Sequence, residues 1–195
     1  MFDLGKVLVD FDWFTAARRI AAKARVTPEA LVEFIKTSDV MIRLEKGQMT
    51  TEQFFGEVRS VIGYQATLQD FQQAFSDIFT EIPEMVLLHA RIQAAGIPTW
   101  IFSNTNDWAV THIRENFPFF ATFDGYFLSY QLGVMKPDAG IYKAAEHTTG
   151  CRSGEILYID DIAENAAAGA ARGWQAVQHV SSDHTISQVE RILFG

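Results

Sequence analysis

Short apolar runs alternate with helical segments throughout the second half of this chain, and this alternation limits the folds open to it. Each of the four apolar runs has the length of a strand and is followed by a segment with helical spacing. The predicted strands are residues 97–102, 123–129, 155–159 and 174–180, and the predicted helices are residues 107–116, 139–148, 163–172 and 184–193. Strands that alternate with helices are typical of βαβ units, so we predict an α/β fold with a parallel sheet.

Residues 13–95 are predicted to be mostly helical. Helix starts with capping residues are found at Thr27-Pro28-Glu29, at Thr50 with Gln53 and at Thr67 with Asp70. The helix from Thr67 is expected to run through Phe79, and a further helix is expected from Pro83 to Ala95. Because Phe2 is expected in the first strand of the parallel sheet, this helical block interrupts the sheet domain.

Charge and cysteine content exclude several classes of protein. The formal charge is −8 and no long basic run is present, so we expect no nucleic-acid partner. Cys151 is the single cysteine, which rules out an internal disulfide and fits a reducing compartment. No signal-peptide pattern and no apolar run of membrane-spanning length are found, so we expect a cytoplasmic protein without a membrane partner.

Polar side chains follow the predicted strands at the points where these strands end. Asp3 comes after Phe2, Ser103 follows the strand 97–102, and Asp160-Asp161 follow the strand 155–159. Lys136 lies in a loop that can reach the same edge. Ligands of open parallel sheets bind beyond the carboxyl ends of the strands, so we expect these groups to converge there. Together they are what transfer of a phosphoryl group to a carboxylate needs.

These segments resemble the motifs of the haloacid dehalogenase-like hydrolases, in the branch with a helical cap inserted after the first motif. The matching segments are, in order, Phe2-Asp3-Leu4-Gly5, Ser103-Asn104-Thr105-Asn106, Lys136-Pro137, and Asp160-Asp161 with Asn165. Within that family the resemblance is to bacterial sugar-phosphate phosphatases of the glucose-1-phosphate type. It implies a Rossmann-like, three-layer core of residues 1–11 and 96–195, and a small cap of residues 12–95.

The resemblance also implies a mechanism, in which Asp3 attacks phosphorus and forms an aspartyl-phosphate that water hydrolyses. Mg²⁺ would neutralise the charge between the carboxylate and a small phosphorylated metabolite. Its implied ligands are Asp3, the carbonyl of Gly5 and Asp161. Lys136 would offset charge on the phosphate and the nucleophile.

Further residues are given supporting roles by the same resemblance. Ser103 and the backbone N–H of Asn104 would hold phosphoryl oxygens. Asp160 would orient Lys136, and Asn165 would orient a water bound to the metal.

Two features depart from the family pattern. Many phosphatases of this family carry a second aspartate, the acid/base for the leaving group, at the position of Gly5. Either a water or Asp10 replaces it, or the substrate has a leaving group that needs little protonation, such as the hemiacetal of a sugar 1-phosphate. Moreover, only Met1 and Phe2 precede Asp3, whereas strands usually span about 5–6 residues. The first strand is therefore expected to be very short, unless an alternative start has truncated it.

Two other functions are compatible with these residues. Hydrolytic dehalogenation of 2-haloacids also uses an aspartate ester, but it needs no cation and would use Asp160-Asp161 poorly. Gly5 and the short first strand favour instead a catalytically weak module that binds a metabolite in a regulatory role. Trp13, Met41, Arg43 and Glu45 are candidates for cap residues that face the substrate. The sequence is compatible with a monomer and with a homodimer.

Overall fold

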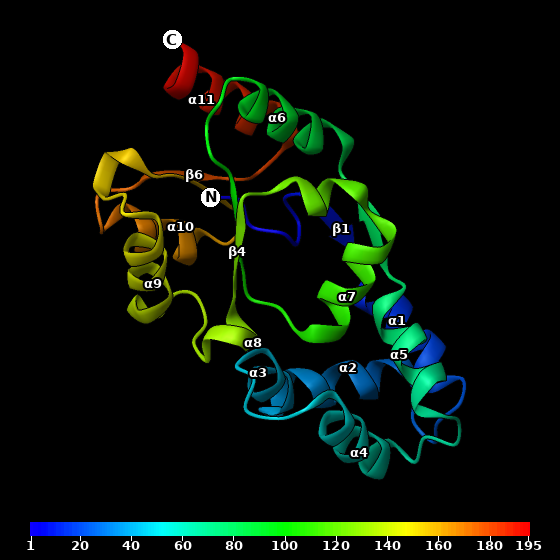
Figure 1. Cartoon of the computed structure of the whole chain (residues 1–195). Coiled ribbons are helices and arrows are strands. Elements are labelled where there is room, and N and C mark those ends of the chain that lie inside the picture. Colours follow the sequence, from blue (N-terminus) through cyan, green and yellow to red (C-terminus); the bar gives the residue numbers. More distant parts are fainter.

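The structure is a computed structural model that describes residues 1–195, and a parallel sheet lies at its centre (Figure 1). Strand β3 (Trp100–Ser103) pairs in parallel with β4 (Gly125–Leu128), and β5 (Leu157–Asp160) pairs in parallel with β6 (Gln175–Gln178). Each lies within or one residue beyond an apolar run of the sequence. The predicted α/β fold with parallel strands is confirmed.

The N-terminal segment joins the two pairs of strands into one sheet. Phe2 bridges β3 and β5 in parallel. Its N–H donates to the carbonyl of Trp100 (2.8 Å) and its carbonyl accepts from Phe102 (2.7 Å). On the other side, the N–H of Asp3 donates to the carbonyl of Ile159 (2.9 Å). The first strand is as short as expected, yet neighbours on both sides hold the backbone that carries Asp3.

Helices cover both faces of the sheet, which makes three layers. Successive strand residues point to opposite faces, so Ile101 packs with one set of helices and Phe102 with the other. The helices of the first face are α6 (Pro83–Ala94), α7 (Asp107–Asn116) and α11 (Ser182–Phe194), and those of the second are α9 (Ala139–Thr149) and α10 (Ala163–Ala170). Short helical turns at Pro118–Thr122, α8 (Ser129–Leu132) and Ser153–Glu155 complete the core.

Five helices form the cap, which lies below the sheet domain in Figure 1. Their bounds are α1 (Trp13–Ala21), α2 (Pro28–Thr37), α3 (Val40–Glu45), α4 (Thr51–Ile62) and α5 (Leu68–Ser76). Thr50 with Gln53 and Thr67 with Asp70 form the expected capping boxes. The cap has an apolar core of its own, separate from the two clusters that flank the sheet.

An antiparallel pair of strands joins the cap to the core, and sequence analysis did not predict it. Strand β1 (Val9–Phe11) leads into the cap, and β2 (Phe79–Glu81) leads out of it. Their register pairs Phe11 with Phe79. The prediction that Phe79 continues the helix from Thr67 is wrong, because α5 ends at Ser76 and the chain becomes extended. The pair brings the two connections of the cap together.

The predicted cap boundary at residue 95 would place the helix α6 in the cap, but α6 packs with the elements of the sheet domain. Met85, Leu88 and Ile92 of α6 are buried in the same cluster as Phe2, and α6 packs against α11. The helical pattern predicted an apolar face on α6 but not the partner of that face. We propose a cap of residues 12–78 between the two strands of the antiparallel pair.

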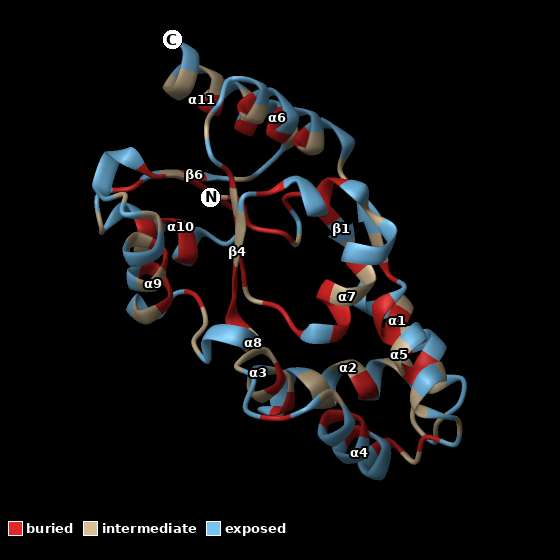
Figure 2. Ribbon diagram, in the orientation of Figure 1, coloured by how far each residue is buried: buried red, intermediate tan, exposed pale blue.

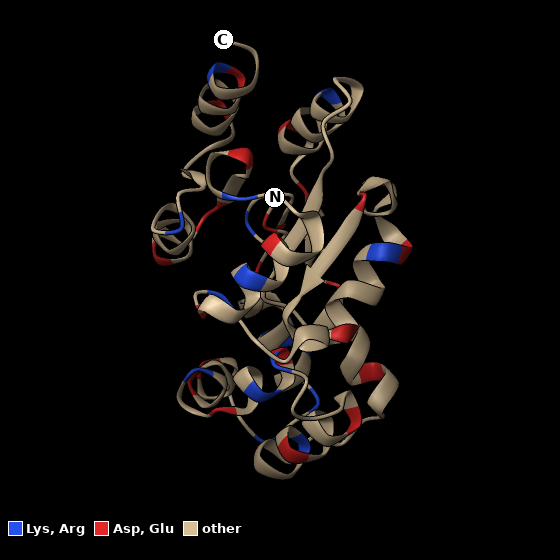
Figure 3. Ribbon diagram, turned by 60° about the vertical axis from the view of Figure 1, so that its left-hand side comes forward, with Lys and Arg blue, Asp and Glu red and all other residues tan.

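Burial follows these layers. In Figure 2 the buried positions run along the sheet and the inward faces of the helices, and the outward faces are exposed. Figure 3 shows acidic and basic positions interspersed over the ribbon. None of the helices combines the length and the apolar character that a membrane crossing requires.

Candidate active site

The carboxylate of Asp3 lies at the end of the central segment of the sheet and is 7% exposed. Its Oδ1 accepts a hydrogen bond from the N–H of Leu4 (2.7 Å) and lies 3.0 Å from Nζ of Lys136. Burial raises the pKa of Asp3, and the ammonium of Lys136 opposes that rise. A buried carboxylate beside one ammonium is held in a defined orientation.

Lys136 connects three separate segments of the chain. Besides the contact with Asp3, its Nζ donates to Oδ2 of Asp160 (2.6 Å) and to the carbonyl of Phe102 (2.8 Å). The side chain is almost completely buried. An ammonium has three protons, and here each has an acceptor. Lys136 therefore has no freedom to swing away from Asp3.

The side chain of Asn104 fixes the loop that carries Lys136. Its Nδ2 donates to the carbonyl of Lys136 (2.9 Å), and its Oδ1 accepts from the N–H of Lys136 (2.8 Å). Sequence analysis gave Asn104 only a role through its own backbone N–H. The reciprocal amide contact adds a positioning role, because it ties the end of β3 to the lysine loop.

Asp160 is surrounded by donors. Besides Lys136, Oδ2 accepts from the hydroxyl of Tyr158, and Oδ1 accepts from the N–H of Ile162 (2.8 Å) and from Nδ2 of Asn165 (3.2 Å). These contacts use the lone pairs of the carboxylate, which is fully buried. Asp160 thus contacts both Lys136 and Asn165.

Three carboxylates gather at this edge. Oxygen atoms of Asp3, Asp160 and Asp161 all lie within 4.8 Å of one another. Burial raises the pKa of Asp161, and the neighbouring Asp160 raises it further. One ammonium, from Lys136, faces these three acids. The excess of negative charge and the oxygen ligands fit a hard divalent cation. Asp161 is half-buried, and of the three carboxylates it has the fewest protein partners, so it is the one most available to such a cation.

The chain matches the model of a known protein family over most of its length. The model of the haloacid dehalogenase-like hydrolases matches residues 1–173. The chain belongs to this family. The matched residues include Asp3, Ser103, Lys136 and Asp160-Asp161.

Known proteins resemble the chain over nearly its whole length. A D-ribitol-5-phosphate phosphatase of Bacteroides thetaiotaomicron is 24% identical over 184 residues, which cover 91% of this chain and 89% of that protein. A sesquiterpene phosphatase of Aspergillus oryzae is 23% identical over 195 residues, which cover 99% and 95%. The structure of a family member from Bacteroides thetaiotaomicron, in complex with magnesium and inorganic phosphate, has a TM-score of 0.82 at 22% identity and covers 91% of each chain.

Of the remaining predicted site residues, Ser103 lies at the end of a strand of the sheet, whereas Asp10 lies on the surface. Ser103 ends β3 and is buried, and its hydroxyl donates to the carbonyl of Asn104 (3.3 Å). Asp10 lies outside the acidic group: it is exposed and pairs with Lys6 at 2.5 Å. The suggestion that Asp10 replaces the missing acid stays a prediction, and the surface ion pair lends it no support.

The ring of Phe11 explains why position 5 is a glycine. A Cβ built on Gly5 would lie 2.8 Å from Cε1 of Phe11. The ring itself is held by Trp13 and Phe79, with centroids 5.6 and 5.9 Å away. Strand β1 thus occupies, through Phe11, the space that a side chain at position 5 would need.

Gly5→Ala is expected to lower the free energy of unfolding by about 1–3 kcal/mol, because it overpacks a site closed by an aromatic ring. Phe11→Leu removes the ring edge, so Gly5→Ala should cost less in that background. Urea denaturation of the four proteins of this cycle measures the difference. Equal costs of Gly5→Ala in both backgrounds would show that Phe11 does not exclude a side chain at position 5.

Two residues near the site were not assigned to it from the sequence: Tyr158 was not singled out, and Glu45 was placed in the cap. Tyr158 stands two residues before Asp160 on one strand, so both point to the same face, and period-two spacing could have identified it. Glu45 was named only as a cap candidate. Burial and the charge of Asp3 raise its pKa to about 7, and Lys136 opposes this. No local pattern could place a residue of a separate helix so near the core.

Proposed function

We propose that this hydrolase is a Mg²⁺-dependent phosphatase that acts on a small phosphorylated metabolite through an aspartyl-phosphate on Asp3. The observation that carries the proposal is the 3.0 Å contact between Asp3 and Lys136 beside the half-buried Asp161. A nucleophilic carboxylate, a fixed ammonium and a further acid for a cation occupy one edge of the sheet. The two phosphatases among the relatives support this reaction.

The residues divide the chemistry among them. Asp3 supplies the oxygen that attacks phosphorus, and the bond to the leaving oxygen breaks. Water then attacks the aspartyl-phosphate, which releases phosphate and restores Asp3. Lys136 stabilises negative charge on the phosphoryl oxygens, and Asp160 keeps Lys136 in place. Ser103 and the N–H of Asn104 would hold phosphoryl oxygens as charge redistributes.

Asp3, Asp161 and the carbonyl of Gly5 would hold the cation. A bound Mg²⁺ supplies the positive charge that lets a carboxylate approach a phosphate. The surplus of acids over bases at this edge supports that role, because three carboxylates face one lysine. The sequence motifs favour a sugar phosphate as the metabolite. Other phosphate esters are alternatives, since the two relatives are named for ribitol phosphate and for a sesquiterpene.

Removal of divalent cations is expected to abolish phosphate release from acetyl phosphate, and added Mg²⁺ is expected to restore it. The physical reason is that Lys136 is the single protein cation in contact with Asp3, so a metal ion must supply the remaining positive charge. Activity is measured by phosphate release after treatment with a chelator. Cation-independent halide release from a 2-haloacid would favour the dehalogenase, and no turnover at saturating Mg²⁺ would favour the regulatory module.

A further inference from the structure

The cap contains a partly open apolar cavity of about 310 Å³. All five cap helices line it, and every lining residue except Lys36 and Glu45 is apolar. Ligand sites typically have volumes of about 300–1,000 Å³, so the cavity is large enough for a small organic group. An apolar ligand that enters the cavity would displace water from a largely apolar surface, which favours its binding.

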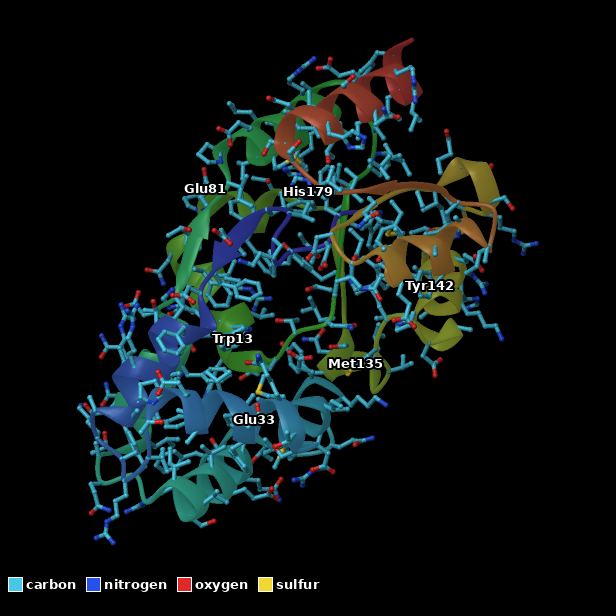
Figure 4. All side chains as sticks on the ribbon, turned by 180° about the vertical axis from the view of Figure 1, so that it is seen from behind. Trp13, Glu33, Glu81, Met135, Tyr142 and His179 are labelled. Carbon is cyan, nitrogen blue, oxygen red and sulfur yellow. The ribbon has the colours of Figure 1, made fainter.

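The cavity lies toward the catalytic edge. Glu45, one of its two polar residues, ends α3, which packs against α8 at the end of β4. The charges of Asp3 and Lys136 both act on the Glu45 carboxyl. Trp13, which Figure 4 shows where the chain passes from core to cap, lines the cavity as well.

The aromatic wall of the cavity also contacts the core beside the second motif. The rings of Phe54, Phe71 and Phe75 line the cavity, and their centroids lie 6.0, 6.1 and 5.8 Å from that of Trp108. Trp108 stands in the first turn of α7, directly after the Ser103–Asn106 segment. The aromatic wall therefore packs on the helix that begins directly after the second motif.

We propose that the cap cavity binds the organic group of the substrate and that this group is an apolar chain or ring rather than a polyol. The proposal rests on the proposed phosphatase function. Hydroxyl groups of a sugar would be buried against carbon, and an unpaired buried hydroxyl is costly. Among the lining side chains, only Lys36, Glu45 and the indole N–H of Trp13 offer hydrogen bonds. Methylene or aromatic groups, in contrast, gain from leaving water.

Binding of alkyl phosphonates tests the cavity without requiring turnover. Methyl, butyl and hexyl phosphonate are titrated into the full chain with Mg²⁺ by calorimetry. Each methylene that enters the cavity is expected to strengthen binding by up to about fourfold. We expect hexyl phosphonate to bind at least about tenfold more tightly than methyl phosphonate. Equal affinities along the series would overturn the proposal.

A filled cavity should remove this dependence on chain length. Ala17 is buried and lines the cavity, whereas Ala30 is exposed on α2 and does not. In Ala17→Leu the ratio of hexyl to methyl affinity is expected to fall toward one, and in Ala30→Leu it should match the wild type. An unchanged ratio in a folded Ala17→Leu protein would contradict the assignment. If Ala17→Leu does not fold, the wild-type series decides.

Hydrolysis of acetyl phosphate separates the two proposals, because its organic group is too small to use the cavity. Turnover of acetyl phosphate together with equal affinity for all phosphonates would contradict the cavity assignment and leave the phosphatase in place. Tighter binding of hexyl phosphonate together with no turnover of any phosphate would contradict the phosphatase and support an apolar binding site.

Discussion

Asp3→Asn is expected to reduce the turnover of aryl phosphates by at least about 10⁴-fold, as loss of a covalent nucleophile does. The amide has nearly the same shape as the carboxylate, but it is not a nucleophile and it carries no charge to attract a cation. The fold should persist, because Phe2 and the backbone of Asp3 hold the strand through main-chain hydrogen bonds. Phosphate release and thermal unfolding are measured side by side.

A matched control uses an exposed acid that is not one of the predicted site residues. Asp183 lies in the first turn of α11, and Asp183→Asn should retain wild-type turnover. If Asp3→Asn kept substantial activity while the control behaved as expected, another residue would be the nucleophile. Loss of activity that came only with loss of folded protein would be uninformative, and the unfolding measurement identifies that case.

Lys136→Met is expected to lower the free energy of unfolding by about 3–5 kcal/mol in metal-free buffer. The change leaves Asp3 and Asp160 buried without their shared ammonium, and an uncompensated buried charge is costly. Turnover should fall as well, by about 10²–10³-fold, because charge on the phosphoryl group is no longer offset. Urea denaturation and phosphate release measure the two effects.

The chain offers an exposed lysine as a control for this effect. Lys6 pairs with Asp10 at the surface, where the two side chains are 43% and 57% exposed. Lys6→Met should therefore cost less than about 1 kcal/mol. Adding Asp160→Asn to Lys136→Met should restore part of the lost stability, since one buried charge is removed. Equal costs of Lys6→Met and Lys136→Met would contradict the role of burial.

The core of the fold could be predicted from the sequence because its signals are local. The helix predicted at residues 107–116 coincides with α7, and each predicted strand contains or overlaps a strand of the sheet. The polar residues Asp3, Lys136 and Asp160-Asp161 were expected to meet because parallel strands end at one edge. Their contacts confirm that expectation of geometry.

Other features depend on contacts that no local pattern records. Phe79 follows Phe75 by four residues, which is helical spacing, but its pairing with Phe11 makes it a strand residue. An amphipathic pattern could not tell whether α6 packs on the cap or on the sheet. The packing of α3, which carries Glu45, against α8 likewise depends on how the cap lies on the core.

A crystal structure with Mg²⁺ and beryllium fluoride would test the nucleophile most directly. Beryllium trifluoride mimics a phosphoryl group on the carboxylate that carries it. The account predicts the adduct on Asp3, within hydrogen-bonding distance of Lys136 and Ser103. An adduct on Asp160, Asp161 or Glu45 would contradict it.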